Sequence, residues 1–161
     1  MYKQCAGIKT CGVGYKLLVG FAVVAFFSLI TLYAGSDKIF FDDVVRQTQQ
    51  FMDWEKTIRL TPEQELVKKA ALTKLAAPCC SDNSAYTCCC SCNISRTIWG
   101  LSNYMIAKHD AGVSEVQEKV AEWVRFINPN GYSGKACYVR GCSRAFKHDG
   151  CGGMRRDSVA Y

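Results

Sequence analysis

Cysteine is concentrated in one short stretch of this chain, residues 79–92, where six of the fourteen residues are cysteine. The stretch places Cys79-Cys80 eight residues before a second group, Cys88-Cys89-Cys90-Ser91-Cys92. Cysteine at this density serves disulfides, a metal site, a thiol redox centre or a mixture of these. The rest of the chain must hold this stretch in position. How the chain folds determines whether these cysteines form disulfides, bind a metal or act as a redox centre.

Cys89 and Cys92 form a Cys-x-x-Cys at the start of a helix that Asn93 is predicted to cap. Backbone N–H groups at a helix N-terminus stabilise a thiolate, which suits metal ligation or thiol–disulfide exchange. We therefore predict Cys89 and Cys92, together with Cys88 and Cys90, as ligands for copper or zinc or as a redox site. The sequence leaves open the alternative that these cysteines are structural crosslinks, in which adjacent cysteines reach different partners.

Three further cysteines lie in an irregular, basic and glycine-containing segment near the C-terminus, residues 131–151. His148 stands three residues before the last of them, a spacing that suits an additional metal ligand. Without an apolar face, the segment needs crosslinks, a metal or a partner to hold a position, and we expect crosslinks to the 79–92 stretch. The predicted disulfide cysteines are Cys79, Cys80, Cys137, Cys142 and Cys151.

Several enzyme classes are not supported by the sequence. It contains no Cys-x-x-Cys-His for covalent haem, no glycine-rich phosphate loop, no Ser/His/Asp set and no His-Glu-x-x-His. We therefore predict no catalytic residue. The net charge of +6 is not accompanied by a Lys/Arg run interleaved with aromatic residues, so nucleic acid is not an expected partner.

An uncharged apolar run, residues 17–36, precedes most of the cysteines. About twenty helical residues span the roughly 30 Å of a bilayer core. Residues 1–16 carry three lysines and no acid, which predicts a cytoplasmic N-terminus and an extracytoplasmic remainder, periplasmic or on the outer face. The sequence thus predicts an uncleaved single-pass anchor, with a cleaved signal peptide at Ala34-Gly35-Ser36 as the alternative.

Apolar periodicity predicts a mainly α fold after the anchor. We expect a stalk helix over residues 37–60, a cysteine-rich helical hairpin or bundle over 61–154 with an irregular crosslinked C-terminal segment, and a flexible tail over 155–161. The first helix of the bundle should begin with the capping box Thr61-Pro62-Glu63-Gln64 and run to about Ala77, where Pro78 stops it.

Two later helices show clear apolar stripes. The first follows Asn93 and ends at Gly112, and the second begins with a capping box at Ser114-Glu115-Val116-Gln117 and is broken by Asn128-Pro129-Asn130-Gly131. The expected core positions of these helices are Ile94, Ile98, Leu101, Met105, Val116, Val120, Trp123, Val124 and Ile127. On the first helix of the bundle, the expected inward positions are Leu66, Val67, Ala70, Ala71 and Leu75.

The region 66–127 resembles two bacterial families. Cys88, Cys90 and Cys92 match the alternating cysteines of the membrane-attached proteins with a Pro-Cys-Tyr-Cys-Gly-Cys motif; Thr87, Cys89 and Ser91 replace its other residues. That resemblance implies metal binding. The Cys-x-x-Cys before a helix, followed by Gly112-Val113-Ser114 and a second helix, is similar to the membrane-tethered thiol reductase of cytochrome c maturation. That resemblance implies a redox pair at Cys89 and Cys92.

Together these observations predict a membrane-anchored extracytoplasmic protein that binds a soft metal or performs thiol redox chemistry. It would serve as an accessory factor of an electron-transfer or cofactor-assembly system, with the membrane and other membrane subunits as partners. The alternative is a non-catalytic accessory subunit of a larger membrane complex whose cysteines are structural only.

Overall fold

The computed structural model describes residues 38–78, 80–88, 90–131, 145–148, 151–153, 159 and 161. Among these residues, no helix combines the length and the apolar character needed to cross a bilayer. The predicted membrane helix, residues 17–36, lies outside the described part of the chain, as do residues 1–16 and most of the tail 155–161. The predictions for these segments remain predictions.

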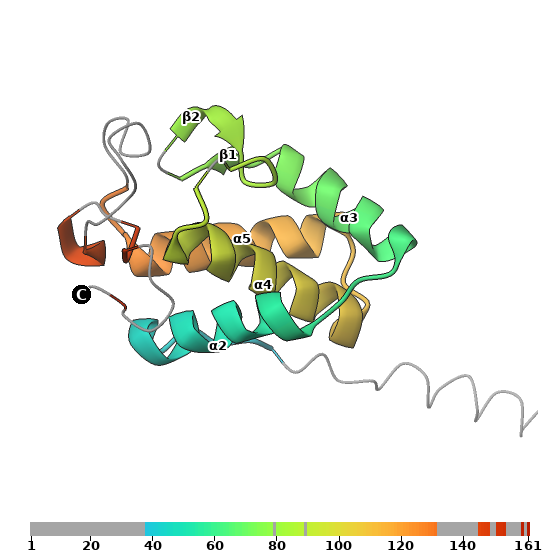
Figure 1. The fold of residues 1–161 in the computed structure, drawn as a ribbon, viewed down its shortest axis with the longest axis horizontal. Helices are drawn as coiled ribbons and strands as arrows, with labels where there is room; N and C mark the ends of the chain where they lie inside the picture. Colours follow the sequence, from blue (N-terminus) through green and yellow to red (C-terminus); the bar gives the residue numbers. More distant parts are fainter. Residues whose placement is uncertain are drawn as a thin grey trace, which may run out of the picture. The chain divides into compact units, whose positions relative to one another are not determined.

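The described chain is mainly α-helical, as predicted, with one small antiparallel hairpin that was not predicted. The central helix, α4, contacts each of the other three long helices (Figure 1). In chain order the elements are α2 (Val44–Thr57), α3 (Pro62–Thr73), β1 (Ala76–Ala77), β2 (Cys80–Ser84), α4 (Asn93–His109), α5 (Val113–Ile127) and the short 3-10 helix η3 (Phe146–His148).

Helix α2 is part of the helical unit, where the sequence predicted a separate stalk over residues 37–60. Residues from Ile39 onward form one compact unit, and the largest helix–helix contact is that between α2 and α4. Phe51 and Met52 of α2 are fully buried, whereas Phe40, before the helix, is 74% exposed. One face of α2 is therefore buried against α4. The apolar periodicity of α2 could not show this, because a solvated amphipathic helix has the same pattern.

The α2–α4 contact is close because α4 carries a glycine where the two helices cross. A Cβ added to Gly100 would overlap the carbonyl oxygen of Phe51 and lie 2.8 Å from the backbone nitrogen of Glu55. Only a residue without a Cβ allows the two backbones to approach so closely. Gly100 therefore sets the distance between α2 and α4.

The start of α3 is confirmed, but its end and its inward face differ from the prediction. Thr61 Oγ1 accepts a hydrogen bond from Gln64 N at 3.3 Å, and Gln64 Oε1 accepts one from Thr61 N at 3.1 Å. The helix ends at Thr73 rather than near Ala77, because Ala76 and Ala77 pair with β2. Leu66 and Ala70 were expected to face inward, but both are exposed, whereas Ala71 is fully buried as expected.

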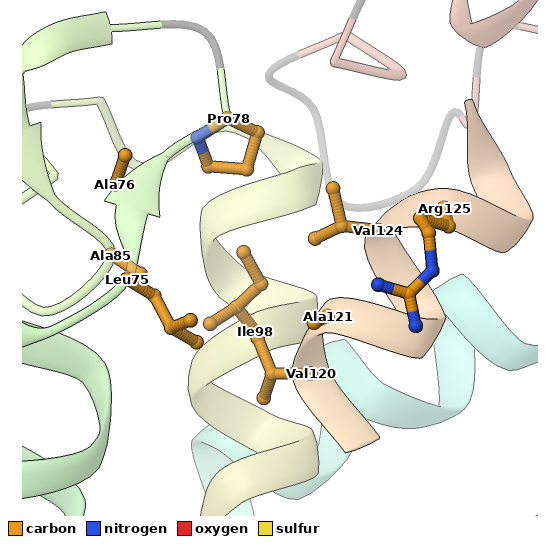
Figure 2. Close-up of a pocket in the computed structure, with 9 residues that line it drawn as sticks. All are labelled: Leu75, Ala76, Pro78, Ala85, Ile98, Val120, Ala121, Val124 and Arg125. Atoms are coloured by element: carbon orange, nitrogen blue, oxygen red, sulfur yellow. The ribbon is translucent and has the colours of Figure 1, made fainter. Parts of the chain in front are cut away.

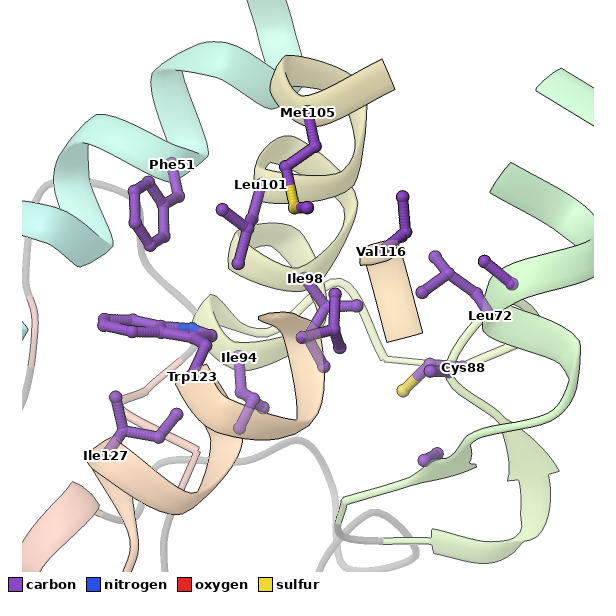
Figure 3. Packing of buried hydrophobic residues seen from close by; sticks show 14 of the residues in the cluster. Phe51, Leu72, Cys88, Ile94, Ile98, Leu101, Met105, Val116, Trp123 and Ile127 are labelled. Carbon is purple, nitrogen blue, oxygen red and sulfur yellow. The ribbon is translucent and has the colours of Figure 1, made fainter. Parts of the chain in front are cut away.

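The stripes of α4 and α5 are confirmed as the centre of the core. Figure 3 shows Ile94, Ile98, Leu101 and Met105 of α4 facing residues of α5, with Phe51 of α2 alongside. The predicted Ser114 capping box is wrong, because α5 begins two residues earlier. Gly112 is its N-cap, and the Gly112 N–H donates to Glu115 Oε2 at 2.8 Å.

Helix α4 ends at His109 rather than at Gly112. Its C-cap, Asp110, has a left-handed backbone (φ 52°), and the Asp110 N–H donates to the Met105 carbonyl. Asp tolerates this conformation better than most residues because its short polar side chain can bond locally. The expected break after α5 is confirmed, since the helix ends at Ile127 with Asn128 as C-cap.

Candidate functional site

The alternating cysteines Cys88, Cys90 and Cys92 lie inside the fold, between the hairpin and the start of α4. They are 9%, 8% and 0% exposed and belong to the same buried cluster as Leu72 and Ile98. Figure 3 shows Cys88 beside Leu72. Cysteine in such surroundings behaves as a small apolar residue that fills the core. The structure therefore places these three sulfurs where they contribute to packing.

Cys92, not Asn93, is the N-cap of α4, which corrects the predicted helix start. Its side chain forms no capping hydrogen bond; its Sγ lies 3.6 Å from the hydroxyl of Ser95. That hydroxyl also donates to the Cys90 carbonyl and lies 3.0 Å from the Cys92 carbonyl. Ser95 thus holds the backbone of the cysteine stretch against the first turn of α4.

The N-terminus of α4 is closed by residues 151–153, nearly sixty positions away in the sequence. The Asn93 N–H donates to the Gly153 carbonyl at 2.9 Å, and the Ile94 N–H donates to the Cys151 carbonyl at 3.2 Å. The buried side-chain amide of Asn93 donates to the Gly152 carbonyl. Asn93 is therefore the first residue of α4 rather than its cap, and its side chain joins the start of the helix to the 151–153 turn.

The turn at residues 151–153 depends on glycine and on burial. Gly152 and Gly153 have positive φ values of 70° and 74°, in a region that other residues rarely adopt. A Cβ on Gly152 would overlap the ring of Phe146, which is itself buried. Cys151 is fully buried and takes part in a disulfide, whose second cysteine stays a prediction.

This closure changes what the start of α4 can do chemically. The first backbone N–H groups of a helix are the donors that would stabilise a thiolate or another anion. At α4 the N–H groups of Asn93 and Ile94 already donate to the carbonyls of Gly153 and Cys151. The position that the sequence favoured for a reactive sulfur is therefore occupied by the chain itself.

The other predicted site residues are placed only in part. Cys80 lies in β2 and His148 in η3, and for both only the backbone is described. Among the described residues, no three His, Cys, Asp or Glu side chains converge as a metal-binding group would require. The predicted residues that lie outside the described part of the chain are Cys79, Cys89, Cys137 and Cys142.

Two side-chain hydrogen bonds fix the loop that leads from β2 to Cys88, and the sequence predicted neither of them. The Trp99 indole N–H donates to the Ala85 carbonyl at 2.9 Å. The Tyr86 hydroxyl donates to Glu65 Oε1 at 3.1 Å. The loop is thereby attached to α4 through Trp99 and to α3 through Glu65. An aromatic residue with a polar group is the one available sequence signal for such a contact.

The Tyr86–Glu65 contact leads to a prediction about pH. Burial, followed by the hydrogen bond and the charge of Glu65, raises the pKa of the Tyr86 phenol above its usual value. Because the folded-state pKa is raised, the resulting stability is fully present below about pH 10 and is lost as the pH rises through the folded-state pKa. We expect Glu65→Gln to lower the pKa of Tyr86, as measured by NMR titration of its ring carbons. An unchanged pKa would show that Glu65 does not act on this phenol.

The comparisons with known proteins give no relative from which a site could be transferred. No protein-family model, no curated protein and no solved structure matches this chain.

Proposed function

We propose that this protein is a membrane-anchored, extracytoplasmic accessory subunit without catalytic activity, in which the cysteines stabilise a small helical unit. The observation that carries the proposal is the closure of the α4 N-terminus by the carbonyls of Cys151 and Gly153. A redox centre built on Cys89 and Cys92 would need a sulfur that the substrate can reach and free N–H groups that stabilise its thiolate. Here the N–H groups of Asn93 and Ile94 hold a distant part of the chain in place.

Burial of the sulfurs supports the same proposal. Thiol–disulfide exchange requires direct attack on or by an accessible sulfur. Cys92 has no exposed surface, and Cys88 and Cys90 have little. Their packing with Leu72 and Ile98 favours a structural role at this end of the bundle.

The membrane part of the proposal rests on the sequence. The uncharged residues 17–36 follow a lysine-containing segment without acids, the pattern of a single-pass helix with a cytoplasmic N-terminus. The helical unit would then be held close to the bilayer, where larger membrane subunits are the expected partners. The copper, zinc or thiol-redox hypothesis shares this anchor and differs only in the role of the cysteines.

A double variant, Cys89→Ser with Cys92→Ser, separates the two roles. If the pair is structural, we expect the free energy of unfolding to fall by about 1–3 kcal/mol, because a hydroxyl group replaces the fully buried Cys92 sulfur and is costly to bury. The parent protein should contain no stoichiometric copper or zinc. Thermal unfolding and elemental analysis of the full-length protein in nanodiscs measure both quantities.

The matched control is Ser91→Ala, because Ser91 lies between the two cysteines and is exposed. It should leave stability within about 0.5 kcal/mol of the parent, as is usual for surface substitutions. The structural proposal fails if the parent holds about one metal ion per chain and the double variant loses that ion while keeping its helical content and its melting temperature.

A further inference from the structure

A cavity of about 240 Å³ lies between β1, α4 and α5 (Figure 2). Its walls are almost entirely apolar and include Leu75, Ile98, Val120 and Val124. Ile98 and Val120 are also part of the buried core, so the floor of the cavity is fixed by the packing of α4 against α5. Concave apolar sites with a few placed polar groups are the usual form of small-molecule sites.

Arg125 is the one charged residue among the described residues that line the cavity. It is exposed, and no carboxylate in the described ranges forms an ion pair with it. Glu122, one turn earlier on α5, pairs instead with Lys119 at 2.6 Å. The guanidinium is thus available at the edge of an apolar space, and its planar group of donors matches a carboxylate.

The size of the cavity limits the ligand. An apolar cavity of about 150 Å³ is enough to hold a benzene molecule. The additional volume here leaves room for a short alkyl chain attached to one ring. We propose that this cavity binds a small apolar molecule with a single negative charge, of the arylalkyl carboxylate class, with its ring against Ile98 and Val120 and its carboxylate on Arg125.

The test compares three ligands that share one apolar body, measured by calorimetry on the full-length protein in nanodiscs, with empty nanodiscs subtracted. The ligands are 4-phenylbutyrate, the neutral 4-phenylbutanol and the cationic 4-phenylbutylamine. The carboxylate should bind about fivefold more tightly than the alcohol, the upper end for an ion pair with an exposed partner, and the amine should bind most weakly. Equal affinity for all three ligands, or binding of none, would overturn the proposal.

Variants locate the site. Arg125→Gln should remove the preference for the carboxylate, whereas Arg59→Gln, the same change at an exposed position in the α2–α3 link, should leave that preference intact. Ala121→Phe on α5 and Ala76→Phe on β1 introduce a ring from opposite walls, and each should weaken all three ligands at least tenfold. Circular dichroism identifies any variant that does not fold. A carboxylate preference that persists in Arg125→Gln, or full binding in a folded Phe variant, would place the ligand elsewhere.

Discussion

Replacing Gly100 with alanine is expected to destabilise the protein by about 2 kcal/mol. The added Cβ would overlap the carbonyl oxygen of Phe51 and approach the backbone nitrogen of Glu55 to 2.8 Å. Both are backbone atoms, so α2 as a whole must move away from α4. Such overpacking costs about 1–3 kcal/mol or more, and here it outweighs the gain of about 1 kcal/mol that alanine brings to an exposed helix interior.

Gly112→Ala is the matched control for this variant. A Cβ at Gly112 would meet only Glu115 Oε2, at 3.8 Å, and Gly112 has an ordinary φ of −78°. We expect a loss of no more than about 1 kcal/mol, which is the usual difference between glycine and alanine at an N-cap. Urea unfolding compares the two proteins. Equal stability of the two variants would contradict the close crossing of α2 and α4.

Replacing Trp123 with alanine is expected to have a comparable or larger effect, a loss of about 3–5 kcal/mol. Trp123 is fully buried on α5, and its ring centroid lies 4.9 Å from that of Phe51 and 5.2 Å from that of Phe41. The indole N–H donates to Thr97 Oγ1 at 2.9 Å. The side chain therefore joins α5, α2 and α4, and its removal leaves a large cavity where they meet.

Two further variants make the Trp123 result specific. Trp123→Phe keeps an aromatic ring but loses the hydrogen bond to Thr97, so it should cost roughly 1 kcal/mol more than the change in volume alone. Leu66→Ala, on an exposed face of α3, should change stability by less than about 0.5 kcal/mol. Urea titration measures the free energy of unfolding of the parent and of each variant. A loss of less than 1 kcal/mol for Trp123→Ala would contradict the core described here.

The parts of the fold that the sequence predicted well are those that local patterns determine. The stripes of α4 and α5 recur at helical spacing, and the core formed by Ile98 and Val120 follows from them. The Thr61–Gln64 capping box is a short-range signal, and it is confirmed. At α5 the N-cap is Gly112, which has no side chain, so only one half of a capping box forms, the hydrogen bond from the Gly112 N–H to Glu115 Oε2.

The parts that were missed depend on contacts distant in sequence. Ser81-Asp82-Asn83-Ser84 has the composition of a turn, yet it forms most of β2, in which Ser84 pairs with Ala76 and Cys80 pairs with Ala77. The sequence of α2 does not show that its backbone packs closely against α4 at Gly100.

The candidate site was hardest to predict for the same reason. The N–H groups at the start of α4 donate to the backbone carbonyls of Cys151 and Gly153. Every residue has a backbone carbonyl, so residue types cannot predict this contact. The expected link between residues 131–151 and the 79–92 stretch stays a prediction. A bridge closing a loop of some fifty residues would contribute on the order of 4 kcal/mol in the chain-entropy model.

Peptide mapping of the native full-length protein, alkylated before unfolding and digested without reductant, tests the structural role of the cysteines most directly. The account predicts no modification of Cys88, Cys90 or Cys92, because their sulfurs are buried, and a bridge from Cys151 to the 79–92 stretch. Rapid modification of Cys88, Cys90 or Cys92 in the native protein, or a Cys151 bridged only to Cys137 or Cys142, would contradict it.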